Sequence, residues 1–213
     1  CDYYSRTIYG TRVSISIGII VVFFVTLIAI IGGSIAGYYG GVTDSIIGRI
    51  TDIWFVIPTI LGGIVILSVT RSRNIGTVSL VLIVLGWATL LRLVRSSVLA
   101  AKANDYVDAA RVMGASNTRI IIRHILPNAI APVIIVSAIY IGVVIAAEAA
   151  LSFLGVGLQL PAISWGLMIS TAQQRIITAP YLLVFPGAFL SVTVFSFILM
   201  GDALRDALDP KLR

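Results

Sequence analysis

Cysteine, histidine and charge are all scarce in this chain. Among its 213 residues there is one cysteine and one histidine, and charged residues make up 11% of the total. A single cysteine cannot form an internal disulfide, and these two side chains offer no cluster of ligands for a structural metal site. The sequence therefore predicts neither redox chemistry nor a bound metal, and it predicts no catalytic residues.

A secretory signal is also missing. Such a signal has a basic start followed by a short apolar core, whereas this chain opens with Cys-Asp-Tyr-Tyr-Ser-Arg and has no initiator Met. We expect the sequence to be truncated at its N-terminus.

Apolar residues are what the chain has in abundance. They make up 59% of it and the mean hydropathy is +1.07, which is too apolar for an ordinary soluble domain. A net charge of +6 could suggest nucleic acid, but the basic residues punctuate apolar runs instead of gathering on a water-facing domain. We therefore expect a membrane protein in contact with lipid, and no nucleic-acid partner.

The apolar runs predict an all-α, polytopic bundle of membrane helices. A transmembrane helix needs about 20 apolar residues, and runs such as 131–147 are apolar on every face, unlike the alternating strands of a barrel. We expect residues 1–213 to form one transmembrane domain. Its five predicted spans are Ser14–Gly37, Ile53–Val69, Gly76–Val98, Ile130–Leu154 and Tyr181–Met200.

The distribution of Lys and Arg predicts the orientation. With the C-terminus in the cytoplasm, ten of the 15 basic residues lie inside and five outside, as the positive-inside rule expects. The five outside are Arg6, Arg12, Arg71, Arg73 and Arg175, and the pair Arg71 and Arg73 is a visible exception. The ten inside are Arg49, Arg92, Arg95, Lys102, Arg111, Arg119, Arg123, Arg205, Lys211 and Arg213.

Prolines and paired glycines mark special points in the spans. Pro58 and Pro132 lack a backbone donor and should bend or begin helices. The glycine pairs at 32–33, 40–41 and 62–63 predict close helix packing in preference to hinges.

The most polar stretch, residues 101–128, predicts a helix, a tight turn and a second helix. Asn104 or Asp105 can cap the first helix, and Gly114 supplies a left-handed stop. Ser116 or Asn117 can cap the second helix, Thr118–Leu126, which Pro127 should end.

This helical pair has two interpretations of equal weight. It can seat in a partner's groove, since Ala109 and Ala110 permit close approach and flanking apolar residues provide anchors. It can also lie on the membrane surface as an amphipathic hairpin. The expected anchors are Val107, Met113, Ile120, Ile121 and Ile125, flanked by Arg111, Arg119 and Arg123.

The spacing of one motif resembles a known family. Asp108-Ala109-Ala110, three residues, Gly114, nine residues and then His124-Ile125-Leu126-Pro127 resembles the EAA loop of binding-protein-dependent ABC importer permeases. Asp108 replaces the pattern's Glu and His124 replaces an Ile. The further matches that follow look like the C-type permease of dipeptide or oligopeptide importers, a family with six spans, the first of which would precede this sequence. Those matches are Tyr9-Gly10-x-Arg12-x-Ser14, Gly37-Tyr38-Tyr39-Gly40-Gly41, Asp44, Asp52 with Pro58, Glu148 to Gly155, Ser164-Trp165-Gly166 and Gly201-Asp202 to Asp209-Pro210.

The resemblance implies a function and a set of partners. The chain would be a permease subunit that moves peptides across the cytoplasmic membrane, with its coupling loop and C-terminus in the cytoplasm. Two ATPase subunits would dock on the loop and use ATP and Mg, because this chain has no phosphate-binding loop. A second homologous permease and an extracytoplasmic substrate-binding protein would complete the importer. The residues assigned to coupling are Asp108, Ala109, Ala110, Gly114, Arg119, His124, Leu126 and Pro127.

A second group of residues is expected near the translocation pathway or its gate. Glu148 is an ionisable residue at membrane depth, where an unpaired charge is costly; contact with serines or backbone at the aqueous interface is an equally weighted alternative. Ser152 begins a segment, residues 152–180, that resembles the family's outer re-entrant loop. Trp165 in that loop is expected as an interfacial anchor.

Other functions stay open at this point. A nickel or other small-solute permease of the same family, or a membrane scaffold or channel subunit, would share the composition and topology. An intramembrane enzyme would need a nucleophile and a base within the spans, and the single histidine lies in the loop.

Overall fold

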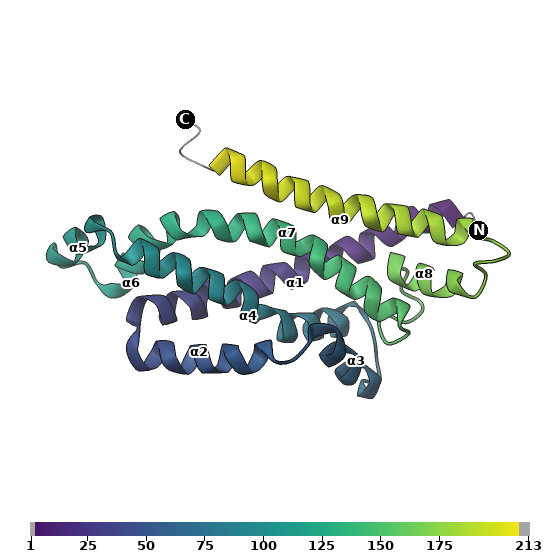
Figure 1. Ribbon diagram of the computed structural model, residues 1–213, viewed down its shortest axis with the longest axis horizontal. Helices are drawn as coiled ribbons and strands as arrows, with labels where there is room; N and C mark the ends of the chain where they lie inside the picture. The colour runs from purple at the N-terminus through teal and green to yellow at the C-terminus, as the bar shows by residue number, and fades with distance from the viewer. Residues whose placement is uncertain (1–2, 209–213) are drawn as a thin grey trace. The chain divides into compact units, whose positions relative to one another are not determined.

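The structure is a computed structural model that describes residues 3–208, and every regular element within that range is helical. The all-α prediction is therefore confirmed. Cys1, Asp209, Pro210, Lys211 and Arg213, which entered the sequence predictions, lie outside the described residues. In chain order the elements are α1 (Tyr3–Tyr39), α2 (Gly41–Phe55), α3 (Thr59–Val69), α4 (Ile75–Lys102), α5 (Asp105–Val112), α6 (Asn117–Ile120), the π-helical turn η1 (Ile121–Ile125), α7 (Leu126–Phe153), α8 (Trp165–Gln173) and α9 (Tyr181–Leu208) (Figure 1).

Four helical stretches in the described residues are individually long and apolar enough to cross a membrane. They are α1, α4, the continuous stretch Asn117–Phe153, and α9, and they agree with four of the five predicted spans. The predicted second span, Ile53–Val69, falls on a broken pair of helices, because α2 and α3 meet the same test only together, with a bend of 78° between them.

Pro58 is the physical cause of that break. It lacks a backbone donor and disfavours helical backbone in the residue before it. Its φ of −63° and ψ of 122° put it at the N-cap of α3. The prediction that Pro58 bends or begins a helix is therefore confirmed.

Pro127 does not end a helix, so the prediction that the second hairpin helix stops at this residue is wrong. α6 passes through η1 directly into α7, so Pro127 is the second residue of α7 and Pro132 lies inside it. The Leu126 N–H donates to the Ile121 carbonyl, five residues back. This wider π-helical spacing just before Pro127 lets the helix continue past a residue that cannot donate.

The chain forms two compact units, and the long helices contribute to both. One unit comprises Ile57–Leu85, Ala138–Met200 and the described residues up to Phe23. The other comprises Phe24–Val56, Gly86–Ser137 and the described residues from Gly201. We refer to them as the first and the second unit.

Glycine allows close helix packing within each unit. In the second unit, a Cβ added to Gly33 of α1 would lie 2.7 Å from the Val94 Cβ of α4. In the first, a Cβ added to Gly63 of α3 would lie 3.0 Å from the Leu151 Cδ2 of α7. These two glycine pairs serve packing, as predicted, whereas Gly40 and Gly41 have φ of 67° and 54° and nothing near a Cβ, so they form the turn between α1 and α2.

Candidate functional site

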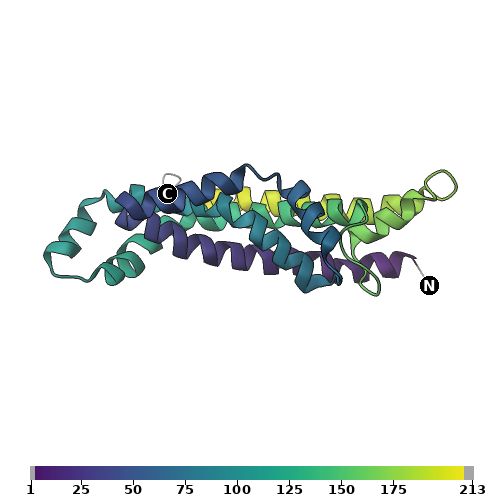
Figure 2. The same cartoon turned by 90° about the horizontal axis from the view of Figure 1, so that it is seen from below.

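The candidate coupling site is a helical hairpin, residues 105–125, formed by α5, α6 and η1 in the second unit (Figure 2). α5 begins one residue after Asn104, which has the extended backbone of an N-cap. The Asn104 side chain, however, donates to the Ala100 and Ala101 carbonyls at 3.1 and 2.9 Å. It therefore closes the end of α4, and the expected side-chain cap on α5 is absent from the described bonds.

Gly114 supplies the turn of the hairpin. Its φ of 79° lies in the left-handed region, which glycine enters without a Cβ penalty. The Gly114 N–H donates to the Arg111 carbonyl at 3.0 Å, and the Ala115 N–H to the Ala110 carbonyl at 3.1 Å. These two bonds form a Schellman motif, which satisfies carbonyls that the end of α5 would leave free. The predicted left-handed stop is confirmed.

Ser116 then caps α6, one of the two caps that the sequence predicted. Its Oγ accepts a hydrogen bond of 3.4 Å from the Arg119 N–H. Asn117 is the first helical residue and has another role, since its Oδ1 accepts a hydrogen bond of 2.9 Å from the Tyr38 hydroxyl.

The apolar residues of the hairpin divide between its inside and its surface. Val107, Ile120 and Ile125 are each 0% exposed and Ala110 is 1% exposed, so none of them offers surface to a partner. The expectation that Val107, Ile120 and Ile125 are anchors for a partner is therefore wrong. The most exposed large apolar side chains are Val112, Met113 and Ile122, at 88%, 79% and 61%, and Ala109 of α5 is exposed as well.

The other residues assigned to coupling are exposed or partly buried. Asp108 pairs with Arg111 at 2.8 Å on α5, with both side chains more than half exposed. Arg119 and Pro127 are exposed, while His124 and Leu126 are partly buried. The His124 carbonyl accepts a bond of 2.7 Å from Asn128 Nδ2. A surface carboxylate and guanidinium beside exposed apolar side chains are suited to protein docking.

A second candidate site surrounds Glu148 of α7 in the first unit. Glu148 is 0% exposed, and its Oε1 accepts bonds from the hydroxyls of Ser152 at 2.7 Å and Ser164 at 2.9 Å. Each serine in turn accepts from a backbone N–H, Ser152 from Leu158 at 3.1 Å and Ser164 from Leu167 at 3.2 Å. One carboxylate oxygen thereby orients two hydroxyls that hold the segment between α7 and α8.

Trp165, the first residue of α8, completes this cluster. Its indole Nε1–H donates to the Thr7 carbonyl at 3.0 Å, and its backbone N–H donates to Ser14 Oγ at 3.2 Å. The side chain is 0% exposed. The expectation of an interfacial anchor is therefore wrong, because the ring has no surface with which to meet headgroups.

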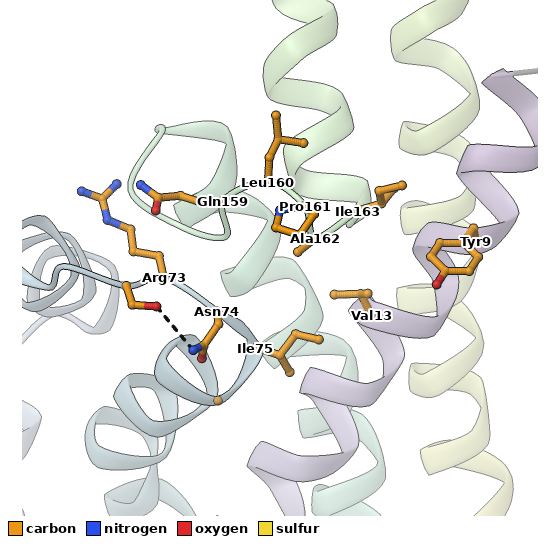
Figure 3. Close-up of a pocket in the computed structure, with 12 residues that line it drawn as sticks. Tyr9, Val13, Arg73, Asn74, Ile75, Gln159, Leu160, Pro161, Ala162 and Ile163 are labelled. Atoms are coloured by element: carbon orange, nitrogen blue, oxygen red, sulfur yellow. Dashed lines mark hydrogen bonds between the residues drawn. The ribbon is translucent and has the colours of Figure 1, made fainter. Parts of the chain in front are cut away.

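A cavity of about 500 Å³ lies beside this cluster in the first unit (Figure 3). The loop before α4 and the loop before α8 meet at its edge, where Gln159 N–H donates to the Arg73 carbonyl at 3.1 Å and Arg73 Nη1 donates to the Gly155 carbonyl at 3.1 Å. Arg73, half of the exception to the charge rule, is thus held by a tertiary contact. The lining residues are Tyr9, Val13, Ser72, Arg73, Asn74, Ile75, Gly76, Gln159, Leu160, Pro161, Ala162 and Ile163.

Sequence reasoning missed several residues that organise the two sites. Ser14 and Ser164 stood inside motifs that matched the family but received no role, and Tyr38 stood in the Gly-Tyr-Tyr-Gly-Gly motif. Thr7, which acts through its backbone carbonyl, carries no signal in its side chain. The usable signal was a small hydroxyl residue within an otherwise apolar span.

Comparison with known proteins identifies the family. A family model described as binding-protein-dependent transport system inner membrane component matches residues 29–213. This chain belongs to that family. The permease is thus a multi-pass transmembrane component of an ABC transporter in the inner membrane, and a transport component rather than an enzyme.

Curated relatives of the permease match it along its whole length. It is 39% identical over 212 residues to the oligopeptide transport system permease protein OppC of Bacillus subtilis, covering 100% of this chain and 69% of OppC. It is 39% identical over 213 residues to the dipeptide transport system permease protein DppC of the same organism, with 100% and 66% covered. For the glutathione transport system permease protein GsiD of Pectobacterium atrosepticum the values are 39%, 100% and 70%.

A solved structure supports the fold of the permease. A chain of the MetNI methionine ABC transporter in an inward-facing conformation is similar with a TM-score of 0.76, over 95% of both chains and at 19% identity. At this identity the likeness concerns the fold alone, and it confirms the predicted class of ABC importer transmembrane subunits.

Proposed function

We propose that this permease imports peptides as one subunit of an ATP-driven, binding-protein-dependent importer. The observation that carries the proposal is whole-chain similarity, at 39% identity in each case, to permeases named for oligopeptides, dipeptides and glutathione. All three names denote peptides, since glutathione is a tripeptide. Residues 1–213 act as one permease domain in this proposal.

The hairpin is the proposed docking element for the ATPase subunits, which bind ATP and Mg. Its surface offers Ala109, Val112 and Met113 beside the Asp108–Arg111 pair, while its buried apolar residues fix the shape of that surface. Coupling loop 101–128 and the C-terminus lie in the cytoplasm. Gly114, Arg119, His124, Leu126 and Pro127 shape or flank the docking surface.

Glu148, Ser152 and Trp165 are proposed to position the outer loop, residues about 152–180, at the gate. Because all three are 1% exposed or less, they hold that segment instead of lining a water-filled passage. The second permease subunit and the extracytoplasmic binding protein complete the assembly and share in choosing the substrate.

The substrate is tested by a ligand screen on the cognate external binding protein. Dipeptides, longer peptides, glutathione and nickel chelates are each added to the purified protein, and its thermal shift is measured. The peptide proposal expects stabilisation by at least one peptide class, followed by ATP-dependent uptake of the same peptide into vesicles that hold the complete transporter. Stabilisation by nickel chelates alone would favour the small-solute alternative, and absence of any ATP-dependent uptake would favour a scaffold.

The role of the partner ATPases is tested with the same preparation. The purified permease alone should hydrolyse no ATP, and hydrolysis should appear when the ATPase subunits are added. Hydrolysis by the isolated, contaminant-free chain would contradict the proposed division of labour.

A further inference from the structure

Tyr38 joins three helical elements of the second unit at the base of the hairpin. It is the penultimate residue of α1 and is 5% exposed. Its hydroxyl donates to Asn117 Oδ1 at 2.9 Å, at the first residue of α6. Its carbonyl accepts a bond of 2.5 Å from Lys102 Nζ, at the last residue of α4. Through its backbone carbonyl and its hydroxyl, this one residue of α1 therefore contacts the end of α4 and the start of the second hairpin helix.

Lys102 approaches Tyr38 in two ways. In addition to the bond with the carbonyl, its ammonium lies 5.4 Å from the centroid of the Tyr38 ring, within the range of a cation–π contact. The ring is thus fixed from the α4 side, so the direction of its hydroxyl toward Asn117 is also fixed.

The ends of α1 and α4 next to Tyr38 are closely packed, and α2 is bonded to α4. A Cβ added to Gly37 would lie 2.9 Å from the Arg95 carbonyl and 2.9 Å from Val98 Cγ1 of α4. Arg95 also forms a two-point ion pair with Asp44 of α2, whose second bond, from Nη2 to Oδ2, is 2.6 Å long. The end of α1, the start of α2 and the end of α4 therefore form one block.

The hairpin is a rigid body on the other side of the joint. The Schellman bonds close its turn, α5 contacts both α6 and η1, and Val107, Ile120 and Ile125 of these elements are buried. The bond between Tyr38 and Asn117 connects this body to the block. A push on α5 that moves α6 must either carry Tyr38 with it or break this part-buried hydrogen bond.

We infer that Tyr38 is a positioning residue for energy coupling, which passes movement of the hairpin to α1 and α4 through its hydroxyl. The inference rests on the proposed function, because it takes the hairpin to be the element on which the ATPase subunits act. A buried tyrosine hydroxyl suits this task, since the ring anchors it in apolar packing while the hydrogen bond gives it a direction.

Tyr38→Phe is the variant that tests the inference. It keeps the ring, the backbone carbonyl and the contact with Lys102, and it removes the hydroxyl alone. Tyr39→Phe is the matched control, because this neighbouring ring packs edge-on against Tyr38 at 5.3 Å but is 53% exposed. Asn117→Ala removes the other partner of the bond.

The measurement is made on the complete transporter in proteoliposomes, with its binding protein and a tryptic digest of casein as the peptide probe. Two quantities are recorded, the stimulation of ATP hydrolysis by the peptide-loaded binding protein, and crosslinking of Met113→Cys in the hairpin to the ATPase subunits. Tyr38→Phe should lower the stimulation about two- to tenfold, because the loss of one neutral hydrogen bond changes an equilibrium constant by about that factor. Crosslinking should stay at the level of the Met113→Cys permease in which Tyr38 is intact.

A double-mutant comparison separates coupling from general damage. If Tyr38 and Asn117 act through their shared bond, the Tyr38→Phe, Asn117→Ala double variant should be no worse than either single variant. Equal stimulation in Tyr38→Phe and Tyr39→Phe would overturn the inference. So would a parallel loss of crosslinking and stimulation in Tyr38→Phe, which would assign the hydroxyl to folding alone.

Failure of the proposed function gives a different result. The Met113→Cys permease with Tyr38 intact would then show no crosslink from residue 113 to the ATPase subunits, and the inference about Tyr38 would be overturned with it. An intact crosslink and stimulation in the Met113→Cys permease, both unchanged when Tyr38→Phe is added, would overturn the role of Tyr38 only.

Discussion

The indole N–H of Trp165 donates a 3.0 Å hydrogen bond to the carbonyl of Thr7, a residue 158 positions earlier in the chain. This bond, together with the one from the Trp165 backbone N–H to Ser14 Oγ, attaches the start of α8 to α1. The segment between α7 and α8 is thereby held at its far end by α1 and at its near end by Glu148.

Trp165→Phe tests how much this attachment contributes. The variant keeps an aromatic ring but loses the indole donor and part of the buried volume, so we expect it to destabilise the first unit by about 1 to 3 kcal/mol. The measurement is the thermal unfolding midpoint in detergent. Trp87→Phe is a control in the second unit, where Trp87 packs against Trp54. An equal fall of the unfolding midpoint in both variants would show that the bond to Thr7 adds nothing beyond the loss of a tryptophan ring.

Two variants of Glu148 test whether this residue positions the outer loop or is needed for its charge. Glu148→Ala removes the acceptor of two buried serine hydroxyls and leaves a cavity, and we expect a loss of about 2 to 5 kcal/mol. Glu148→Gln keeps a carbonyl acceptor for Ser152 and Ser164, so it should be markedly more stable than the alanine variant. Unfolding midpoints and ATP-dependent peptide uptake are measured for both.

The outcome for Glu148→Gln decides between the two roles. Uptake close to wild type would support positioning of the outer loop. A folded glutamine variant without uptake would show that transport needs the carboxylate itself, as a group in the pathway or gate.

Gly114→Val tests the left-handed turn of the hairpin. A β-branched residue at the φ of 79° should cost about 1 to 3 kcal/mol locally. Because the turn carries no membrane span, insertion into the membrane should persist while association with the ATPase subunits and uptake fall. Gly114→Asn is the matched control, since asparagine tolerates left-handed backbone. If the valine variant kept wild-type association and uptake, the alternative that the hairpin lies on the membrane surface would be favoured.

Labelling from the two sides of the membrane tests the orientation. Cys1 is first replaced by serine, and a single cysteine is then introduced at Met113, in the hairpin, or at Gln173, at the end of α8. We expect a membrane-impermeant maleimide to label residue 113 only from the cytoplasm and residue 173 only from outside. Labelling of both positions from one side would contradict the proposed topology.

Regular features with a local cause could be predicted from the sequence. The charge-free runs predicted four of the spans, and Pro58 predicted the start of α3. Gly114 predicted the turn of the hairpin, and Ser116 predicted the cap of its second helix. Each depends on the backbone or side-chain chemistry of one residue, or on the average polarity of a segment, and these are visible without tertiary contacts.

Features that depend on a distant partner could not be predicted. Asn104 has the composition of a helix cap, yet its side chain bonds backward to α4. Ile120 and Ile125 look like partner anchors in an amphipathic pattern, but the fold buries both completely. Trp165 has the usual character of an interfacial residue, and only the approach of Thr7 and Ser14 from α1 makes it a core residue. Apolarity alone does not tell which protein or lipid surface a side chain will meet.

The π-helical turn at Ile121–Ile125 sets the rotation of α7 about the helix axis relative to the hairpin. The bond from Leu126 to Ile121 spans one residue more than an α-helical bond, so the turn is equivalent to inserting a single residue, which rotates all that follows by about 100° about the helix axis. That rotation determines which side of α7 faces α1, where Ser137 Oγ lies 3.0 Å from Thr26 Oγ1. Deleting one residue from the turn would leave an unbroken helix, but it would turn a different stripe of α7 toward α1.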